Sequence, residues 1–265
     1  MRLDSENLSS NSTCSLSFHE IFYERADPRI RDRLLMGNPL PIVSIYAFYI
    51  IFIKYLLPRF MRDRKPIDIE IPGIVLTTVL FFNSLYFFIL ASEPWLFVYN
   101  WRCEPMDYSY TDLALRAVDA SHLFLLSKFF YIFESVLLGL RKKETLTAKY
   151  LLVHHSSYPL VIWAITNYFP GGHATFAGFI NSLTHMLSFA YRLLFVHFFP
   201  NTRLYDFRRI YGLGLFIFQF IAIFIHTFQL FFWNDCDFPM AYAYLVSAYV
   251  TIISTLLIIM VTPEL

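Results

Sequence analysis

Long apolar runs separated by short polar segments occupy almost the whole chain. A helix needs about 20 apolar residues to cross the hydrocarbon core of a bilayer. Only helices and closed barrels satisfy the backbone there, and runs of this length are typical of helices. We therefore predict an all-α integral membrane protein with seven transmembrane helices, at residues 41–57, 74–90, 115–138, 150–168, 174–198, 210–233 and 240–261.

The basic residues between these runs predict an orientation. Lys and Arg concentrate in alternate connections, whereas the other connections hold only Arg102. The positive-inside rule places the basic connections in the cytoplasm, so we expect a lumenal N-terminus and a cytoplasmic C-terminus. The polar residues 1–18 are expected to form a disordered lumenal tail, in agreement with glycosylation sequons at Asn7 and Asn11. The basic connections contain Arg59, Arg62, Arg64, Lys65, Arg141, Lys142, Lys143, Lys149, Arg203, Arg208 and Arg209.

Composition supports a membrane protein and narrows its partners. The 265 residues are 57% hydrophobic and 15% charged, whereas a soluble domain carries about 25% charged residues. The formal net charge of +1 offers no bulk attraction for nucleic acid, so we predict a lipid bilayer, and no nucleic acid, as partner. The chain shows no internal repeat or low-complexity tract, which predicts one domain over residues 1–265.

Two of the three cysteines lie in connections that this orientation puts on the lumenal side. Cys103 lies between the second and third runs, and Cys236 lies between the sixth and seventh. Because the lumen is oxidising, a Cys103–Cys236 disulfide is predicted, with two free lumenal thiols as the alternative. Cys14 lies in the N-terminal tail and is left without an obvious partner.

Polar and ionisable residues inside the third run form one stripe. Lys128, Tyr131 and Ser135 recur at i, i+3 and i+7, so they share one helix face, and Glu134 lies beside it. Ionisable groups within a membrane are costly and are a functional-site hypothesis by default. An alternative role for Glu134 is to pair with a lysine or to anchor the helix at the lipid headgroups.

The fourth and fifth runs add histidines. His154 and His155 are adjacent, and Tyr158 follows His154 by about one turn. Asn181 and His185 are one turn apart on the fifth run. A lone histidine in a bundle is more often a hydrogen-bonded core residue than a catalyst. Together with the polar stripe of the third run, however, these residues favour a shared polar site.

The spacing of these residues favours nucleophilic or acid–base chemistry over a metal site. His154 and His155 point about 100° apart on a helix, and neither has another histidine at i±3 or i±4, so no metal is expected. Imidazole can act as a nucleophile, acid or base near neutral pH. Arg141, Lys142 and Lys143 lie at the predicted membrane edge and are suited to phosphate. The sequence therefore predicts a ligand with a phosphate-bearing head and a fatty tail.

Short motifs follow one another along almost the whole chain. They are Asp27-Pro28-Arg29, Tyr99-Asn100-Trp101-Arg102-Cys103, Asp107-Tyr108-Ser109, Ser127-Lys128-Phe129-Phe130, Leu140-Arg141-Lys142-Lys143, His154-His155-Ser156, Tyr168-Phe169-Pro170-Gly171-Gly172 and Asn181-Ser182 with His185. In this order they resemble the motifs of the ELO-type very-long-chain fatty acid elongases. The resemblance implies a multi-pass, seven-helix enzyme of the endoplasmic reticulum membrane. It implies an acyltransferase that condenses a long-chain acyl-CoA with malonyl-CoA to 3-ketoacyl-CoA, CO2 and CoA, without a cofactor. It leaves open a homo- or hetero-oligomer with other enzymes of the elongation cycle.

The resemblance also implies roles for individual residues. His154 matches the proposed nucleophile, which would hold the acyl group as an acyl-imidazole. His185 would act as acid, base or oxyanion donor, with Asn181 orienting it and Lys128 stabilising negative charge. Further catalytic candidates are His155 and Glu134. The substrate-binding candidates are Arg141, Lys142, Lys143, Tyr131, Tyr158, Tyr191 and Gln219.

Two departures from the family pattern support an alternative function. Leu151 replaces the first histidine of the His-x-x-His-His box. In the Lys-x-x-Glu-x-x-Asp-Thr pattern, which begins here at Lys128, Tyr131 replaces the glutamate and Glu134 the aspartate. The alternative is a non-catalytic elongase paralogue that binds acyl-CoA or an active partner subunit. A seven-helix receptor is disfavoured by the short connections, and a histidine-box desaturase by the missing metal ligands.

Overall fold

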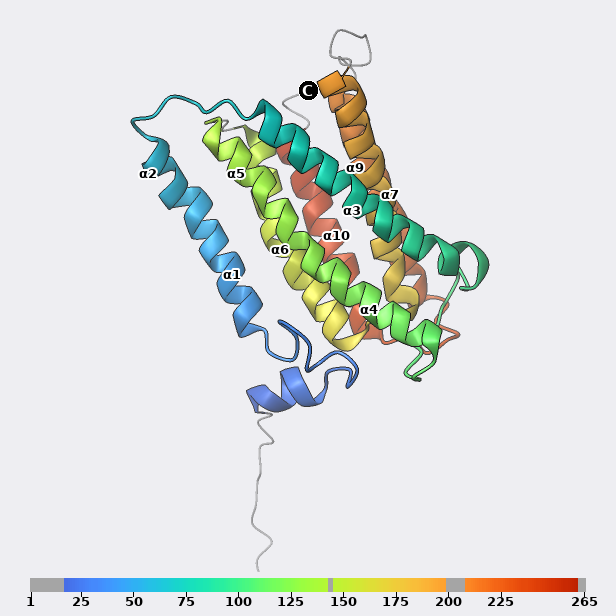
Figure 1. Cartoon of the computed structure of the whole chain (residues 1–265). Helices are drawn as coiled ribbons and strands as arrows, with labels where there is room; N and C mark the ends of the chain where they lie inside the picture. Colours follow the sequence, from blue (N-terminus) through green and yellow to red (C-terminus); the bar gives the residue numbers. More distant parts are fainter. Residues whose placement is uncertain (1–16, 143–144, 199–207, 262–265) are drawn as a thin grey trace, which may run out of the picture.

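The computed structural model describes residues 17–142, 145–198 and 208–261, and this part of the chain is helical without strands. Its long helices form seven rods that coincide with the seven predicted runs (Figure 1). Four rods change helical type along their length. The rods are α1 (Leu40–Ile51) continued by η2 (Phe52–Leu56) and α2 (Leu57–Met61), α3 (Glu70–Phe97), α4 (Asp112–Ser127) continued by η3 (Lys128–Tyr131) and α5 (Ile132–Leu140), α6 (Leu146–Tyr168), α7 (Thr175–Tyr191) continued by η5 (Arg192–Phe198), α9 (Arg208–Phe228) continued by η6 (Gln229–Phe231), and α10 (Met240–Val261).

Five rods of the described chain are long and apolar enough to cross a membrane. They are Leu40–Met61, Glu70–Phe97, Asp112–Leu140, Tyr211–Phe231 and Met240–Met260. The all-α membrane class is confirmed, but the predicted number of seven transmembrane helices is corrected to five. Two long helices, α6 and α7, are not among these five. Helix α6 carries histidine, hydroxyl and amide side chains, and α7 is α-helical for only 17 residues.

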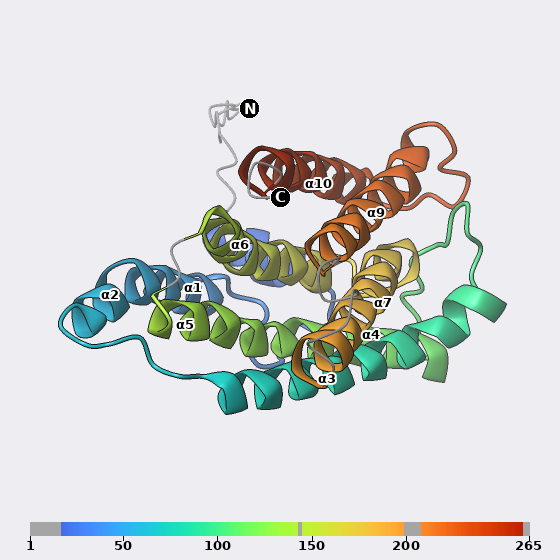
Figure 2. The same ribbon diagram turned by 90° about the horizontal axis from the view of Figure 1, so that it is seen from above.

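The exceptions α6 and α7 are also the most enclosed helices. Of their residues, 11 of 23 in α6 and 9 of 17 in α7 are buried, against 22–33% of the apolar window in each spanning rod. In the view from above, α6 lies between α10 and the rods of α1 and α5, and α7 lies between α3 and α9 (Figure 2). A helix covered by other helices does not need an apolar surface all round, which explains why the polar residues collect on these two.

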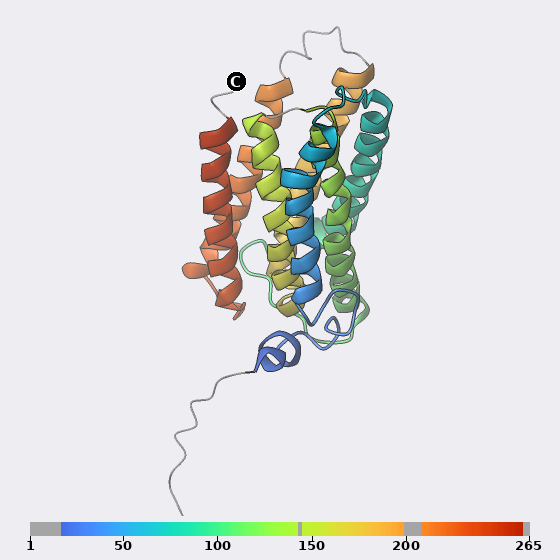
Figure 3. The ribbon, with the colours of Figure 1, turned by 90° about the vertical axis from the view of Figure 1, so that its left-hand side faces the viewer.

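The two ends of the bundle differ in character. We call the end that carries the α2–α3 and α5–α6 connections, with Arg62, Arg64 and Arg141, the basic end. We call the opposite end the disulfide end. There, Cys103 after α3 is bonded to Cys236 before α10, with their Cα atoms 5.7 Å apart. The rods run roughly parallel between these ends (Figure 3).

The N-terminal segment, with the short helix η1 (Glu20–Glu24), packs beneath the disulfide end (Figure 3). Asn167, at the end of α6, holds it by three hydrogen bonds: its Nδ2 donates to the carbonyl of Phe22 at 3.0 Å, its Oδ1 accepts from the N–H of Gly37 at 3.0 Å, and its carbonyl accepts from the N–H of Asp27 at 2.9 Å. Arg29 Nη1 donates to the carbonyl of Asp107 at 2.8 Å. These bonds close the bundle at this end.

Candidate active site

The predicted polar residues of three rods meet around one small cavity in the middle of the bundle. It lies where η3, α6 and α7 approach one another. Six of its seven lining residues are predicted site residues. The lining consists of Lys128, Tyr131, His154, His155, Tyr158, Pro159 and His185.

Lys128 reaches this cavity because the rod tightens into a 3₁₀ turn from Lys128 to Tyr131. Side chains at i and i+3 eclipse in such a turn, so the two residues stay on one face, and each is only 4% exposed. Lys128 Nζ donates to Asn181 Oδ1 at 3.0 Å and lies 3.6 Å from the centre of the Phe124 ring. An amide oxygen and aromatic faces therefore hold a buried amine.

His154 and His155 point in different directions, as their adjacency predicts. The His154 ring lies parallel to that of Tyr158, with the centroids 5.3 Å apart, and its Nδ1 lies 3.1 Å from the hydroxyl of Tyr249 on α10. His155 Nε2 lies 3.8 Å from a carboxylate oxygen of Glu134. His154 is thus held by a neutral hydroxyl, whereas His155 faces a carboxylate.

Behind His155, Glu134 is the centre of a small charged cluster. Its second carboxylate oxygen accepts from Arg192 Nη1 at 2.8 Å, and Arg192 is the first residue of η5. The Glu134 side chain is 10% exposed and that of Arg192 is 41% exposed. Arg192 therefore compensates a largely buried carboxylate, which is costly without a partner.

His185 completes the cavity from α7 and packs among rings. Its ring centroid lies 5.1 Å from that of Tyr131 and 5.6 Å from that of Phe216. Asn181 does not orient it as the family resemblance implies: its amide oxygen accepts from Lys128, and its Nδ2 donates to Gln219 Oε1 at 3.2 Å. Asn181 and Gln219 thus position Lys128.

Several predicted substrate-binding residues lie away from this cavity. Tyr191 stacks on Tyr211 with their ring centroids 4.5 Å apart and does not line the cavity. Arg141 and Lys142 are exposed at the basic end, about 20 Å along the rod from Lys128 at 1.5 Å per residue. Lys143, Asn7 and Asn11 lie outside the described residues.

Two residues that contact predicted site residues were not themselves predicted from the sequence. They are Tyr249, which contacts His154, and Arg192, which contacts Glu134. Arg192 carries a detectable signal, because it is a charge inside an apolar run. Tyr249 follows the buried Tyr242 by seven residues, a spacing that puts both on one face of α10. That spacing marks an inward face but does not identify His154, 95 residues earlier, as the partner.

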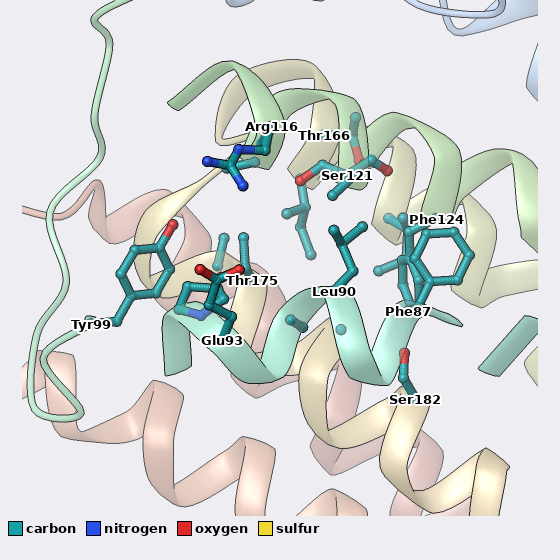
Figure 4. Close-up of a pocket in the computed structure, with 18 of the residues that line it drawn as sticks. Phe87, Leu90, Glu93, Tyr99, Arg116, Ser121, Phe124, Thr166, Thr175 and Ser182 are labelled. Atoms are coloured by element: carbon teal, nitrogen blue, oxygen red, sulfur yellow. The ribbon is translucent and has the colours of Figure 1, made fainter. Parts of the chain in front are cut away.

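A second, larger pocket lies nearer the disulfide end than the histidine cavity. Figure 4 shows the residues that line it. It lies among α3, α4, α6 and α7 and has a mostly apolar lining. Glu93, Tyr99 and Arg116 lie at one side of it and Phe124 at the other (Figure 4). Because the Phe124 ring also covers Lys128 Nζ, this ring separates the larger pocket from the histidine cavity.

The fold and the site together define the class of this protein. It is a helical membrane protein in which histidines and a lysine surround a buried cavity. The sequence profile of the ELO (GNS1/SUR4) family matches residues 34–260. The chain is 33% identical to very long chain fatty acid elongase 7 of Drosophila melanogaster, over 88% of this chain and 70% of that protein. It is 34% identical to very long chain fatty acid elongase 1 of Homo sapiens, over 84% of this chain and 80% of that protein. The chain belongs to the ELO family, which confirms the resemblance and implies a role in fatty acid elongation.

Proposed function

We propose that the protein condenses a long-chain acyl-CoA with malonyl-CoA to 3-ketoacyl-CoA, CO2 and CoA. The observation that carries this proposal is the meeting of His154, His185 and Lys128 at one cavity, from three different rods. One imidazole is available as nucleophile, a second as acid or base, and an amine as a partner for negative charge. No cofactor is required for this reaction.

In the first step, the His154 imidazole attacks the thioester carbon of the acyl-CoA. The carbon–sulfur bond breaks, and the CoA sulfur leaves as a thiolate that takes a proton from the protonated (imidazolium) form of His185, which regains a proton from solvent before the next turnover. The acyl group remains on His154 as an acyl-imidazole. Lys128 lies on the same cavity and stabilises the oxyanion that forms during attack.

In the second step, malonyl-CoA loses CO2, and the electron pair of the broken carbon–carbon bond forms an enolate. The enolate carbon attacks the acyl carbon, and the bond to His154 breaks to restore the imidazole. Lys128 would hold first the malonyl carboxylate and then the enolate oxygen. An amine with amide and aromatic partners is suited to this, because no carboxylate among the described residues already occupies it.

The two ends of the substrate would occupy opposite sides of the cavity. Arg141 and Lys142 at the basic end would bind the phosphates of CoA, and its extended arm would bridge the distance to His154. The fatty tail would enter the larger, mostly apolar pocket beyond Phe124 (Figure 4). The depth of that pocket would then limit the length of the acyl chain.

In the proposed setting the protein lies in the endoplasmic reticulum membrane. The five long apolar rods cross the bilayer, and they pack around α6 and α7, which lie among them (Figure 2). The disulfide end faces the oxidising lumen and the basic end faces the cytoplasm. Acyl-CoA and malonyl-CoA then reach the basic end from the cytoplasm.

The second candidate function is a non-catalytic paralogue that binds acyl-CoA or an active partner subunit. It is favoured by the two departures at the site. Leu151 lies one turn before His154 and packs against the hydrophobic core. The Tyr131 hydroxyl lies 3.3 Å from Ser84 Oγ, where the family pattern carries a carboxylate. Leu151 thus replaces an imidazole by an apolar side chain, and Tyr131 replaces a carboxylate by a neutral hydroxyl.

Incubation with radiolabelled malonyl-CoA and a series of acyl-CoAs tests the two candidates. We expect the unmutated protein to form labelled 3-ketoacyl-CoA and the His154→Gln variant to form none. The matched control is His122→Gln, because His122 is buried outside the cavity with its Nε2 3.0 Å from the carbonyl of Leu34. Condensation at the parental rate by His154→Gln would exclude the covalent route. An inert unmutated protein that still binds acyl-CoA would favour the paralogue.

A further inference from the structure

Three polar contacts form a chain that starts at His154 and ends on the backbone of its own helix. His154 Nδ1 lies 3.1 Å from Tyr249 Oη, and Tyr249 Oη lies 3.4 Å from Ser157 Oγ. Ser157 Oγ in turn donates to the carbonyl of Val153, one turn back, at 2.8 Å. The chain thus joins α6 to α10 through a tyrosine and a serine.

The positions of the hydrogens follow from the last contact. The carbonyl of Val153 can only accept, so the Ser157 hydroxyl hydrogen points to it. Ser157 Oγ can then only accept from Tyr249, and Tyr249 Oη is left to accept from His154 Nδ1–H. All three contacts are hydrogen bonds in this arrangement. If Tyr249 donated to Nδ1 instead, at most two of the three would be satisfied.

We infer that Tyr249 and Ser157 are positioning residues that hold His154 as the tautomer with its proton on Nδ1. A neutral imidazole carries one proton, so Nε2 keeps the lone pair that a nucleophile needs. The link to catalysis rests on the proposed function, whereas the tautomer does not. When Nε2 forms a bond to the acyl carbon, the ring becomes positively charged, and the Nδ1–H···Oη bond becomes a stronger, charge-assisted one.

The stacking around His154 supports the same role. Its ring lies between Tyr158, at 5.3 Å and 16° between the ring planes, and Tyr150, at 6.0 Å and 3°. These rings fix the plane of the imidazole, and the bond to Tyr249 fixes its rotation within that plane. His154 is also 4% exposed, so water does not compete freely for Nδ1.

The direct test is the protonation pattern of His154 in the unmutated protein. Nitrogen NMR of histidine-labelled protein in lipid nanodiscs distinguishes a protonated ring nitrogen from an unprotonated one. The His154 signals are assigned as those that disappear in the His154→Gln spectrum. We expect Nδ1 protonated and Nε2 unprotonated in the unmutated protein. The opposite pattern, or equal amounts of both, would overturn the inference.

Two substitutions test the chain of hydrogen bonds. Ser157→Ala removes the acceptor of the Tyr249 hydroxyl, which then turns to His154 Nδ1 and moves the proton to Nε2. Tyr249→Phe removes the partner altogether and leaves a mixture of tautomers. We expect the rate of acyl-enzyme formation to fall about 10–100-fold in both, by analogy with partners that orient metal-binding histidines. KM should change little, because neither group is placed on the substrate.

The matched control is Tyr242→Phe, which removes a fully buried hydroxyl of α10 that does not contact His154. It should leave the tautomer and the acylation rate unchanged. A Ser157→Ala protein with the parental nitrogen pattern would contradict the inference even if it were slow. If the tautomer is as inferred but His154→Gln still condenses its substrates, the proposed function fails and the tautomer assignment stands.

Discussion

Lys128 is held by an amide oxygen and aromatic rings rather than by a carboxylate. Within the described chain, its Nζ contacts the amide oxygen of Asn181 and the rings of Phe124 and Tyr131, and none of the salt bridges found there includes it. An ionisable group buried without an opposite charge is costly in a membrane protein. That cost is consistent with a group kept for binding an anion, here the malonyl carboxylate and the enolate.

Leu151 provides a prediction at the scale of one residue. It lies one turn before His154, where the family pattern has a histidine that is not the nucleophile. We expect the unmutated protein to condense its substrates and the Leu151→His variant to be faster, by about 10²–10⁴, as for one added acid–base group. Val153→His, at an exposed position of the same helix, is the control and should not be faster. An inert parent that Leu151→His makes active would favour the paralogue.

Single residues differ in how far the sequence predicts their surroundings. Lys128, Tyr131 and Ser135 are predictable as one face because their spacing matches the helical period, and all three are buried. The partner of Asn181 is not predictable in this way. Its amide lies between Lys128 and Gln219, 53 and 38 residues away, and only the packing of three rods decides which group it meets.

At the scale of elements, the apolar runs predict all seven rods, because a long apolar stretch satisfies its backbone only as a helix. They do not predict which rods are enclosed. Enclosure of α6 and α7 depends on contacts with α3, α9 and α10, and no local pattern records those contacts. The 3₁₀ turn at Lys128 is equally invisible, since its sequence Lys-Phe-Phe-Tyr has no helix-breaking residue.

The disulfide ties two connections together and should stabilise the disulfide end. It closes a loop with a sequence separation of 133 residues. The chain-entropy account gives about 4–5 kcal/mol for a loop of this size, less any strain. We expect Cys103→Ser to lower the apparent Tm in detergent, whereas Cys14→Ser should leave it unchanged. Recovery of Cys103 and Cys236 as alkylated free thiols from unreduced protein would contradict the disulfide.

Phe124 separates the two pockets, so its removal should change the acyl chains that fit. Phe124→Ala joins the histidine cavity to the larger pocket (Figure 4). We expect the products to shift to longer chains, measured by mass spectrometry of the 3-ketoacyl-CoAs. Phe130→Ala, at an exposed position of the same rod, is the control. Unchanged product lengths from a folded Phe124→Ala protein would show that the tail does not use this pocket.

At the scale of the whole molecule, the distribution of charge predicts the orientation in the membrane. The disulfide end and the N-terminal segment should face the lumen, together with Asn7 and Asn11. We expect glycosidase treatment to increase the gel mobility of the expressed protein, and replacement of both asparagines by glutamine to abolish the shift. Antibody access to an N-terminal tag after permeabilising only the plasma membrane would place this end in the cytoplasm and refute the orientation.

The covalent step at His154 is the central claim about this protein, and one measurement tests it most directly. The protein is incubated with acyl-CoA alone, quenched, digested and analysed by tandem mass spectrometry. Without malonyl-CoA the acyl-imidazole cannot be consumed by condensation, so the acyl mass should appear on the peptide that contains His154 and localise to that residue. An unmodified His154 in protein that condenses the same acyl-CoA once malonyl-CoA is added would contradict the account.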